Sequence, residues 1–135
     1  MANDPFDLSG AWTGIFNYPR LLPPNSFECR IRDHLGRITG ETIEVAGAGR
    51  RKGQARPAII EGQRTGRAVR FVKHYDDFDR LRTPVHYEGR VNGDGSEIAG
   101  HWSIPGQWSG TFLMIRAKAD ECESERRVEE PLGIV

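Results

Sequence analysis

The segment Val69–Tyr75 places a cation and a phenol at alternate positions among apolar residues. If this segment is a β-strand, Phe71, Lys73 and Tyr75 share one face, because successive side chains of a strand point to opposite sides. An inward face of this kind would be an apolar wall with one ammonium and one hydroxyl, which can hold the head of an amphipathic anion such as a carboxylate. The alternative is that Lys73 lies at a rim and extends its amine into water.

The histidines and acidic clusters do not indicate a metal or catalytic centre. None of the four histidines has the H-x-H or H-E-x-x-H spacing of a metal site. Alternation along the chain predicts that His86 and His101 point outward. The run Asp76–Asp79 offers oxygens for a cation without a defined geometry, and the turn NGDGS lacks the closing glutamate of a calcium loop. We therefore expect no metal, no cofactor and no catalytic residue of these types.

Alternation of apolar and polar residues with period two is the dominant signal between residues 9 and 118. Turn clusters interrupt it about every ten residues, which predicts a series of short β-strands. No segment of this region has the apolar stripe of an amphipathic helix. The stretch AGAGRRKGQARP, residues 46–57, has the composition of a basic loop. The expected strands are residues 9–20, 27–32, 37–45, 58–64, 68–75, 85–91, 97–104 and 110–118.

About eight consecutive strands with short connections predict an all-β fold, an antiparallel meander closed into a small barrel. Glycines within the strands are compatible with closure, because a strand bends most easily where Cβ is absent. A two-sheet sandwich is the main alternative, but its longer connections between sheets are not evident. We expect one domain over residues 1–118 and an acidic, flexible, polar C-terminal tail over residues 119–135.

The ends of this strand series resemble the calycin superfamily, which includes lipocalins, fatty-acid-binding proteins and avidins. Gly10-Ala11-Trp12 opens the first strand, and Arg116 comes late in the last one. The resemblance implies an up-and-down barrel in which Trp12 closes one end and Arg116 packs across its ring. We call Trp12 with Arg116 the plug. Such a contact would be favourable, because burying an indole ring stabilises a fold by about 2–3 kcal/mol and a guanidinium is attracted to the face of the ring.

Composition and the lack of targeting signals limit the classes of partner and the location that the sequence allows. Lys plus Arg equals Asp plus Glu at 19 each, although eleven Lys or Arg stand against five acids between residues 50 and 90. The basic cluster allows an anionic partner, but we see no stacking platform for nucleic acid and expect none bound. No apolar run approaches the roughly 20 residues of a membrane span. The N-terminus lacks the pattern of a secretory signal, and the spacing of Cys29 and Cys122 indicates neither a metal site nor a redox motif. We therefore expect a cytoplasmic protein with two reduced thiols.

The function that these features favour is non-enzymatic binding of a small, mainly apolar molecule with an anionic or polar head. A buried ammonium without a counter-charge is costly, so the ligand, or water at the rim, should satisfy Lys73. Two alternatives stay open: an enzyme of isomerase or cyclase type on a calycin scaffold, and a filled-barrel interaction module that uses the basic loop 46–57. The expected ligand-binding residues are Phe16, Phe27, Phe71, Lys73, Tyr75, Tyr87, Trp102 and Met114.

Overall fold

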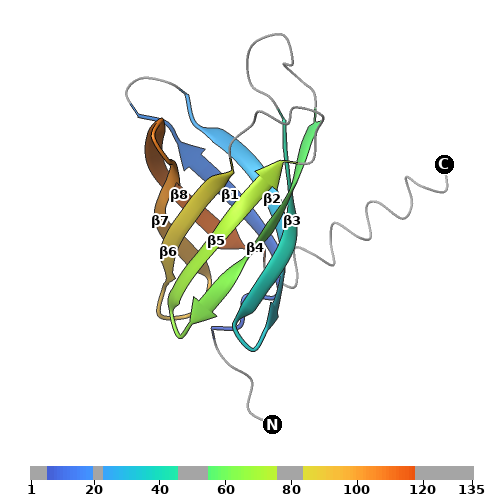
Figure 1. The fold of residues 1–135 in the computed structure, drawn as a ribbon. Coiled ribbons are helices and arrows are strands. Elements are labelled where there is room, and N and C mark those ends of the chain that lie inside the picture. Colours follow the sequence, from blue (N-terminus) through green and yellow to red (C-terminus); the bar gives the residue numbers. More distant parts are fainter. Residues whose placement is uncertain (1–5, 20–22, 46–54, 76–83, 118–135) are drawn as a thin grey trace, which may run out of the picture.

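The computed structural model describes residues 6–19, 23–45, 55–75 and 84–117. These residues contain eight strands that wind around a common axis (Figure 1). No helix long and apolar enough to cross a membrane occurs in these ranges. The strands are β1 (Gly10–Asn17), β2 (Asn25–His34), β3 (Arg37–Val45), β4 (Ala55–Thr65), β5 (Ala68–Tyr75), β6 (Val85–Val91), β7 (Glu97–Ile104) and β8 (Trp108–Arg116).

The eight strands form a closed antiparallel barrel in meander order. Each strand pairs with the next along the chain, and β8 returns to pair with β1. The closing register sets Trp12 opposite Arg116 and Phe16 opposite Phe112. The expected all-β meander is therefore confirmed, and the sandwich alternative is wrong.

Short hairpins explain why consecutive strands pair. Leu35 and Gly36 connect β2 to β3, and both have left-handed backbone conformations, with φ of 54° and 92°. A two-residue turn of this hand matches the right-handed twist of the strands that it joins. Gly66 begins the equally short connection between β4 and β5 with φ of 60°.

The core lies inside the barrel, because inward and outward positions alternate along each strand. The burial pattern of β1 is typical, with Trp12, Gly14 and Phe16 buried and the residue after each of them exposed. Several aliphatic residues remain on the outer surface, among them Ile15, Ile43, Ile59 and Ile115. Inside, seventeen buried apolar side chains of the described ranges form one cluster.

The bounds of β1, β2, β4 and β8 differ from the expected ranges, and strand pairing explains the earlier starts of β4 and β8. β4 begins at Ala55 because Val45 pairs with Ala55 across the hairpin, so Arg56 and Pro57 belong to the strand. β8 begins at Trp108, which pairs with Ile104. Residues 46–54 of the expected loop lie outside the described residues. The tail expected over 119–135 lies outside them as well.

Candidate functional site

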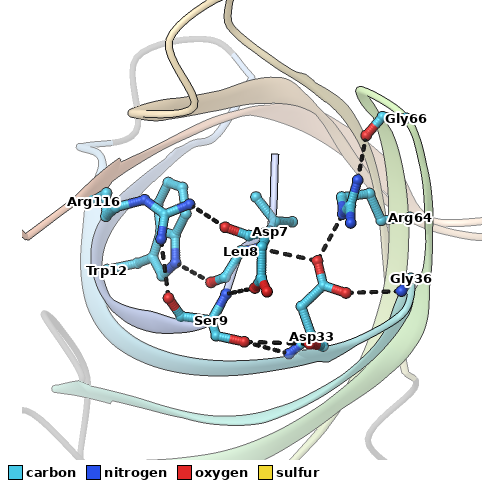
Figure 2. A network of polar contacts seen from close by, with 9 residues as sticks. All are labelled: Asp7, Leu8, Ser9, Trp12, Asp33, Gly36, Arg64, Gly66 and Arg116. Atoms are coloured by element: carbon cyan, nitrogen blue, oxygen red, sulfur yellow. Dashed lines mark hydrogen bonds and ion pairs between the residues drawn. The ribbon is translucent and has the colours of Figure 1, made fainter. Parts of the chain in front are cut away.

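One end of the barrel is closed by Trp12. Its side chain is 2% exposed, and the guanidinium carbon of Arg116 lies 4.6 Å from the centroid of its ring. The Trp12 Nε1–H donates to the carbonyl of Leu8 at 2.8 Å, which ties the ring to the segment that precedes β1 (Figure 2). Here a cation–π contact and a buried indole close the barrel.

Arg116 and Asp33 hold the segment before β1 across this end. Arg116 donates to the carbonyls of Asp7 and Ser9 at 2.6 and 2.9 Å. Asp33 accepts from the Leu8 amide at 3.0 Å and from Arg64 Nε at 2.6 Å. Figure 2 shows these bonds as one network. The Asp33–Arg64 pair was not expected from the sequence, although alternation from Ile60 through Gly62 places Arg64 inward.

The opposite end of the barrel contains a cavity of about 280 Å³. Tyr18, which follows β1, lines this cavity, whereas Trp12 near the start of β1 does not. The lining is therefore contributed by the ends of the strands that lie far from the plug. The residues around the cavity are Phe16, Tyr18, Glu44, Arg56, Lys73, Tyr75, Val85, Tyr87, Trp102, Ile104, Gln107 and Trp108.

A buried ion pair lies at the wall of the cavity. Lys73 Nζ is 3.2 Å from Glu44 Oε2, and only 2% and 1% of the two side chains are exposed. The hydroxyl of Tyr75 donates to the other oxygen of Glu44 at 2.8 Å. Both oxygens of the carboxylate are thus engaged, as a buried charge requires.

Aromatic rings surround the ammonium of Lys73. Its Nζ lies 4.8 Å from the ring centroid of Phe16, 5.7 Å from that of Phe27, 4.7 Å from that of Tyr75 and 5.4 Å from that of Tyr87. The negative faces of such rings stabilise a cation. The expectation that a ligand or rim water must satisfy Lys73 is therefore wrong, because Glu44 and this cage already do so.

Arg56 is the second cation of the cavity. Its guanidinium carbon lies 4.7 Å from the ring centroid of Tyr75, and its Nη1 is 3.8 Å from Glu44 Oε1. Glu44 and Arg56 are opposite each other in the register of β3 and β4. The side chain is 18% exposed, so it reaches from the strand into the site rather than into open solvent.

Aromatic residues form the rest of the wall. The rings of Tyr18 and Trp108 are stacked with centroids 5.0 Å apart, and Trp102 meets both rings edge to face. Trp102 is fixed in place because its Nε1–H donates to the carbonyl of Asn17 at 2.9 Å. The wall thus presents large apolar faces whose positions are set by the strand ends.

The tyrosine hydroxyls of the cavity stay protonated over a wide pH range. Burial is the first cause that raises the pKa of Tyr75, of Tyr87 and of Tyr18, and the charge of Glu44 raises each further. A neutral phenol can both donate and accept a hydrogen bond. These groups therefore offer a ligand polar contacts without adding negative charge.

The expected site residues divide between the cavity and the core. Phe16, Lys73, Tyr75, Tyr87 and Trp102 line the cavity. Phe27, Phe71 and Met114 are buried in the apolar cluster and do not line it.

Seven lining residues were missed, and four of them show different reasons for it. Glu44 follows the inward alternation of β3 but, as a carboxylate, was not assigned to the interior. Arg56 and Trp108 stand in stretches whose glycines and prolines indicate loops. Tyr18 extends the inward face of β1 by one step beyond Phe16, so alternation could have identified it.

No metal site accompanies the cavity: in the described ranges, no group of three or more His, Cys, Asp or Glu could hold an ion. His86 and His101 are exposed on the outer face, as alternation predicted. Asp76–Asp79 lies outside the described residues.

Fold and site together define a closed eight-stranded antiparallel barrel with one end plugged and an aromatic, partly charged cavity at the other. Comparison with known proteins finds no matching family model, no matching curated protein and no matching solved structure.

Proposed function

We propose that this protein is a small-molecule-binding barrel of calycin type, whose ligand is mainly apolar with an anionic or polar head. The observation that carries the proposal is the cavity of about 280 Å³, lined by aromatic rings around the buried Lys73–Glu44 pair. Concave, mostly apolar sites with a few fixed polar groups are the usual form of small-molecule sites. The Trp12–Arg116 plug at the other end supports the calycin relationship.

The size of the cavity favours a compact ligand. Small-molecule sites usually measure about 300–1,000 Å³, so this one is at the lower limit. The stacked Tyr18 and Trp108 rings and the indole of Trp102 offer flat faces to a ring system. Burying such a ligand contributes about 25 cal/mol per Å² of apolar surface removed from water. We therefore propose a ligand of one or two rings rather than a long-chain fatty acid.

The alternatives are less well supported by this geometry. A filled-barrel interaction module requires side chains to occupy the interior at both ends, and the cavity argues against that. An enzyme requires titratable groups at hydrogen-bonding distance in a pocket. Lys73, Glu44 and Tyr75 meet that distance, but both oxygens of Glu44 are already engaged. Binding is therefore the function for which we argue. We propose the cytoplasm as its location, because Cys29 is a buried free thiol and the cytosol keeps thiols reduced.

Calorimetric titration with 2-naphthol, a neutral two-ring probe with a polar head, tests the proposal. The test compares the wild type with Ile104→Trp, which fills the cavity, and with Ile15→Trp, which adds the same bulk to the exposed outer face. We expect one probe molecule bound per wild-type or Ile15→Trp chain, and binding weakened by about tenfold or more in Ile104→Trp. Absence of binding to the wild type, or equal binding to all three, would overturn the proposal.

Native mass spectrometry of protein purified from cells provides a second test that needs no assumed ligand. A small molecule that co-purifies with the wild type but not with Ile104→Trp would support the cavity as its binding site. A co-purifying molecule that Ile104→Trp retains would place the binding site elsewhere.

A further inference from the structure

Arg56 has one edge of its guanidinium without a hydrogen-bond partner among the residues that the structure describes. Its Nε and Nη2 atoms are buried, and neither makes a hydrogen bond to the described residues. Buried polar groups are almost always paired, so each exception calls for an explanation. Because Arg56 lines the cavity, a bound ligand is the natural partner.

The geometry of the guanidinium limits what that partner can be. Nε and Nη2 donate side by side along one edge of a planar group, which matches the two oxygens of a carboxylate. The remaining nitrogen, Nη1, is directed toward Glu44 Oε1 at 3.8 Å. The face of the guanidinium lies over the Tyr75 ring. Glu44 and Tyr75 therefore hold the group, and the Nε/Nη2 edge is the part of it that makes no hydrogen bond to the described residues.

The charge of the cavity limits the partner further. The charged lining residues in the described ranges are Glu44, Lys73 and Arg56. Lys73 and Glu44 compensate each other at 3.2 Å, which leaves the single positive charge of Arg56. A ligand with one negative charge balances this positive charge. A dianion such as a phosphate monoester would bring a second, uncompensated negative charge, which the nearby Glu44 carboxylate would repel.

We propose that the ligand of this barrel is an aromatic carboxylate, bound through two hydrogen bonds from Arg56 Nε and Nη2. The inference rests on the proposed binding function and specifies its ligand class. The ring system lies against Tyr18, Trp102 and Trp108, and the carboxylate faces the edge of Arg56. The buried Lys73–Glu44 pair does not contact the carboxylate; it holds Arg56 in position through Glu44.

Titration with 2-naphthoate and with 2-naphthamide tests the inference, because these probes share ring and shape and differ in charge. The proteins are the wild type, Arg56→Gln, Arg56→Lys and Arg70→Gln, the last removing an exposed arginine on the outer face of β5. In the wild type and in Arg70→Gln, the carboxylate should bind about tenfold or more tightly than the amide. Arg56→Gln should abolish this preference by weakening only the carboxylate. Arg56→Lys should keep part of the preference, because lysine has the positive charge but lacks the two parallel N–H donors of the guanidinium.

The outcomes separate the two proposals. If neither naphthalene probe binds the wild type, the proposed binding function itself fails. If both bind with equal affinity, or if Arg56→Gln weakens both equally, the barrel binds small molecules but the role of Arg56 as a carboxylate receptor is wrong. Equal loss of carboxylate binding in Arg70→Gln would show a general effect of surface charge and would also overturn the inference.

Discussion

The ion pair of Lys73 and Glu44 shows how a single residue can change the interpretation of a site. Alone, an inward lysine suggests an anionic ligand at its amine. With Glu44 at 3.2 Å, the same lysine is part of the protein's own architecture. A buried pair costs desolvation that its mutual attraction must offset, and removing one partner leaves an isolated buried charge.

Replacing Lys73 by Met should therefore destabilise the fold. We expect Lys73→Met to lower the free energy of unfolding by about 3 kcal/mol, because Glu44 loses its main counter-charge. The double variant Lys73→Met/Glu44→Leu should recover most of that loss, because both charges of the buried ion pair are removed. Urea denaturation of the wild type and both variants measures these differences.

An exposed ion pair on the same barrel provides the matched control. Arg32 and Glu41 are 2.8 Å apart, but more than half of each side chain is exposed. Arg32→Met should change the free energy of unfolding by less than about 1 kcal/mol. Equal effects of Lys73→Met and Arg32→Met, or a double variant as unstable as Lys73→Met, would contradict the account of the buried pair.

The Trp12 plug acts through the elements that it joins, since its ring contacts β8 through Arg116 and the segment before β1 through Leu8. Trp12→Ala should lower the free energy of unfolding by about 3–5 kcal/mol, the range for a buried aromatic truncated to alanine. Trp108→Ala, which removes a more exposed indole, should cost much less. Chemical denaturation of both variants checks this, and similar midpoints for the two would refute the plug.

Close packing between strands makes Gly100 on β7 a sensitive position. A Cβ there would collide with the backbone carbonyl of Glu88 and lie 2.5 Å from the Cα of Gly89. Gly100→Ala should therefore cost about 1–3 kcal/mol, as overpacking does. Gly93→Ala is the control, because a Cβ at Gly93 has nothing within 4 Å. Thermal denaturation that ranks the two variants equally would be inconsistent with this packing.

Regular alternation made most elements predictable from the sequence, and departures from it explain the errors. The bounds of β3, β5, β6 and β7 match the expected ranges, because apolar residues alternate cleanly up to their turn signals. The start of β4 was missed because pairing with β3 overrides the loop composition around Arg56. The cavity depends on which polar side chains point inward and find each other, and alternation alone does not pair Lys73 with Glu44.

At the scale of the whole molecule, buried acidic groups should make stability fall at alkaline pH. Burial raises the pKa of the Cys29 thiol from 9.0 to about 12, and burial also raises those of all three tyrosines from 10.0. Above about pH 9 the unfolded chain therefore binds fewer protons than the folded one, so the free energy of unfolding decreases as pH rises.

Urea denaturation at increasing pH and ultraviolet absorbance of phenolate measure this linkage. We expect the denaturation midpoint to fall from about pH 9 upward, with phenolate appearing together with unfolding. The urea-unfolded chain should form phenolate near the ordinary pKa of 10.0. Phenolate formation by all three tyrosines near that value in the folded protein would contradict their burial.

The central claim, that the unplugged end of the barrel is a ligand site, is tested most directly by locating a bound probe. Nuclear Overhauser spectra of the protein saturated with 2-naphthoate report which side chains touch the ring. We expect contacts to Tyr18, Trp102 and Trp108, which line the cavity. Contacts to outer-face residues such as Ile15 and Ile59, or no contacts to any of the three cavity aromatics, would contradict it.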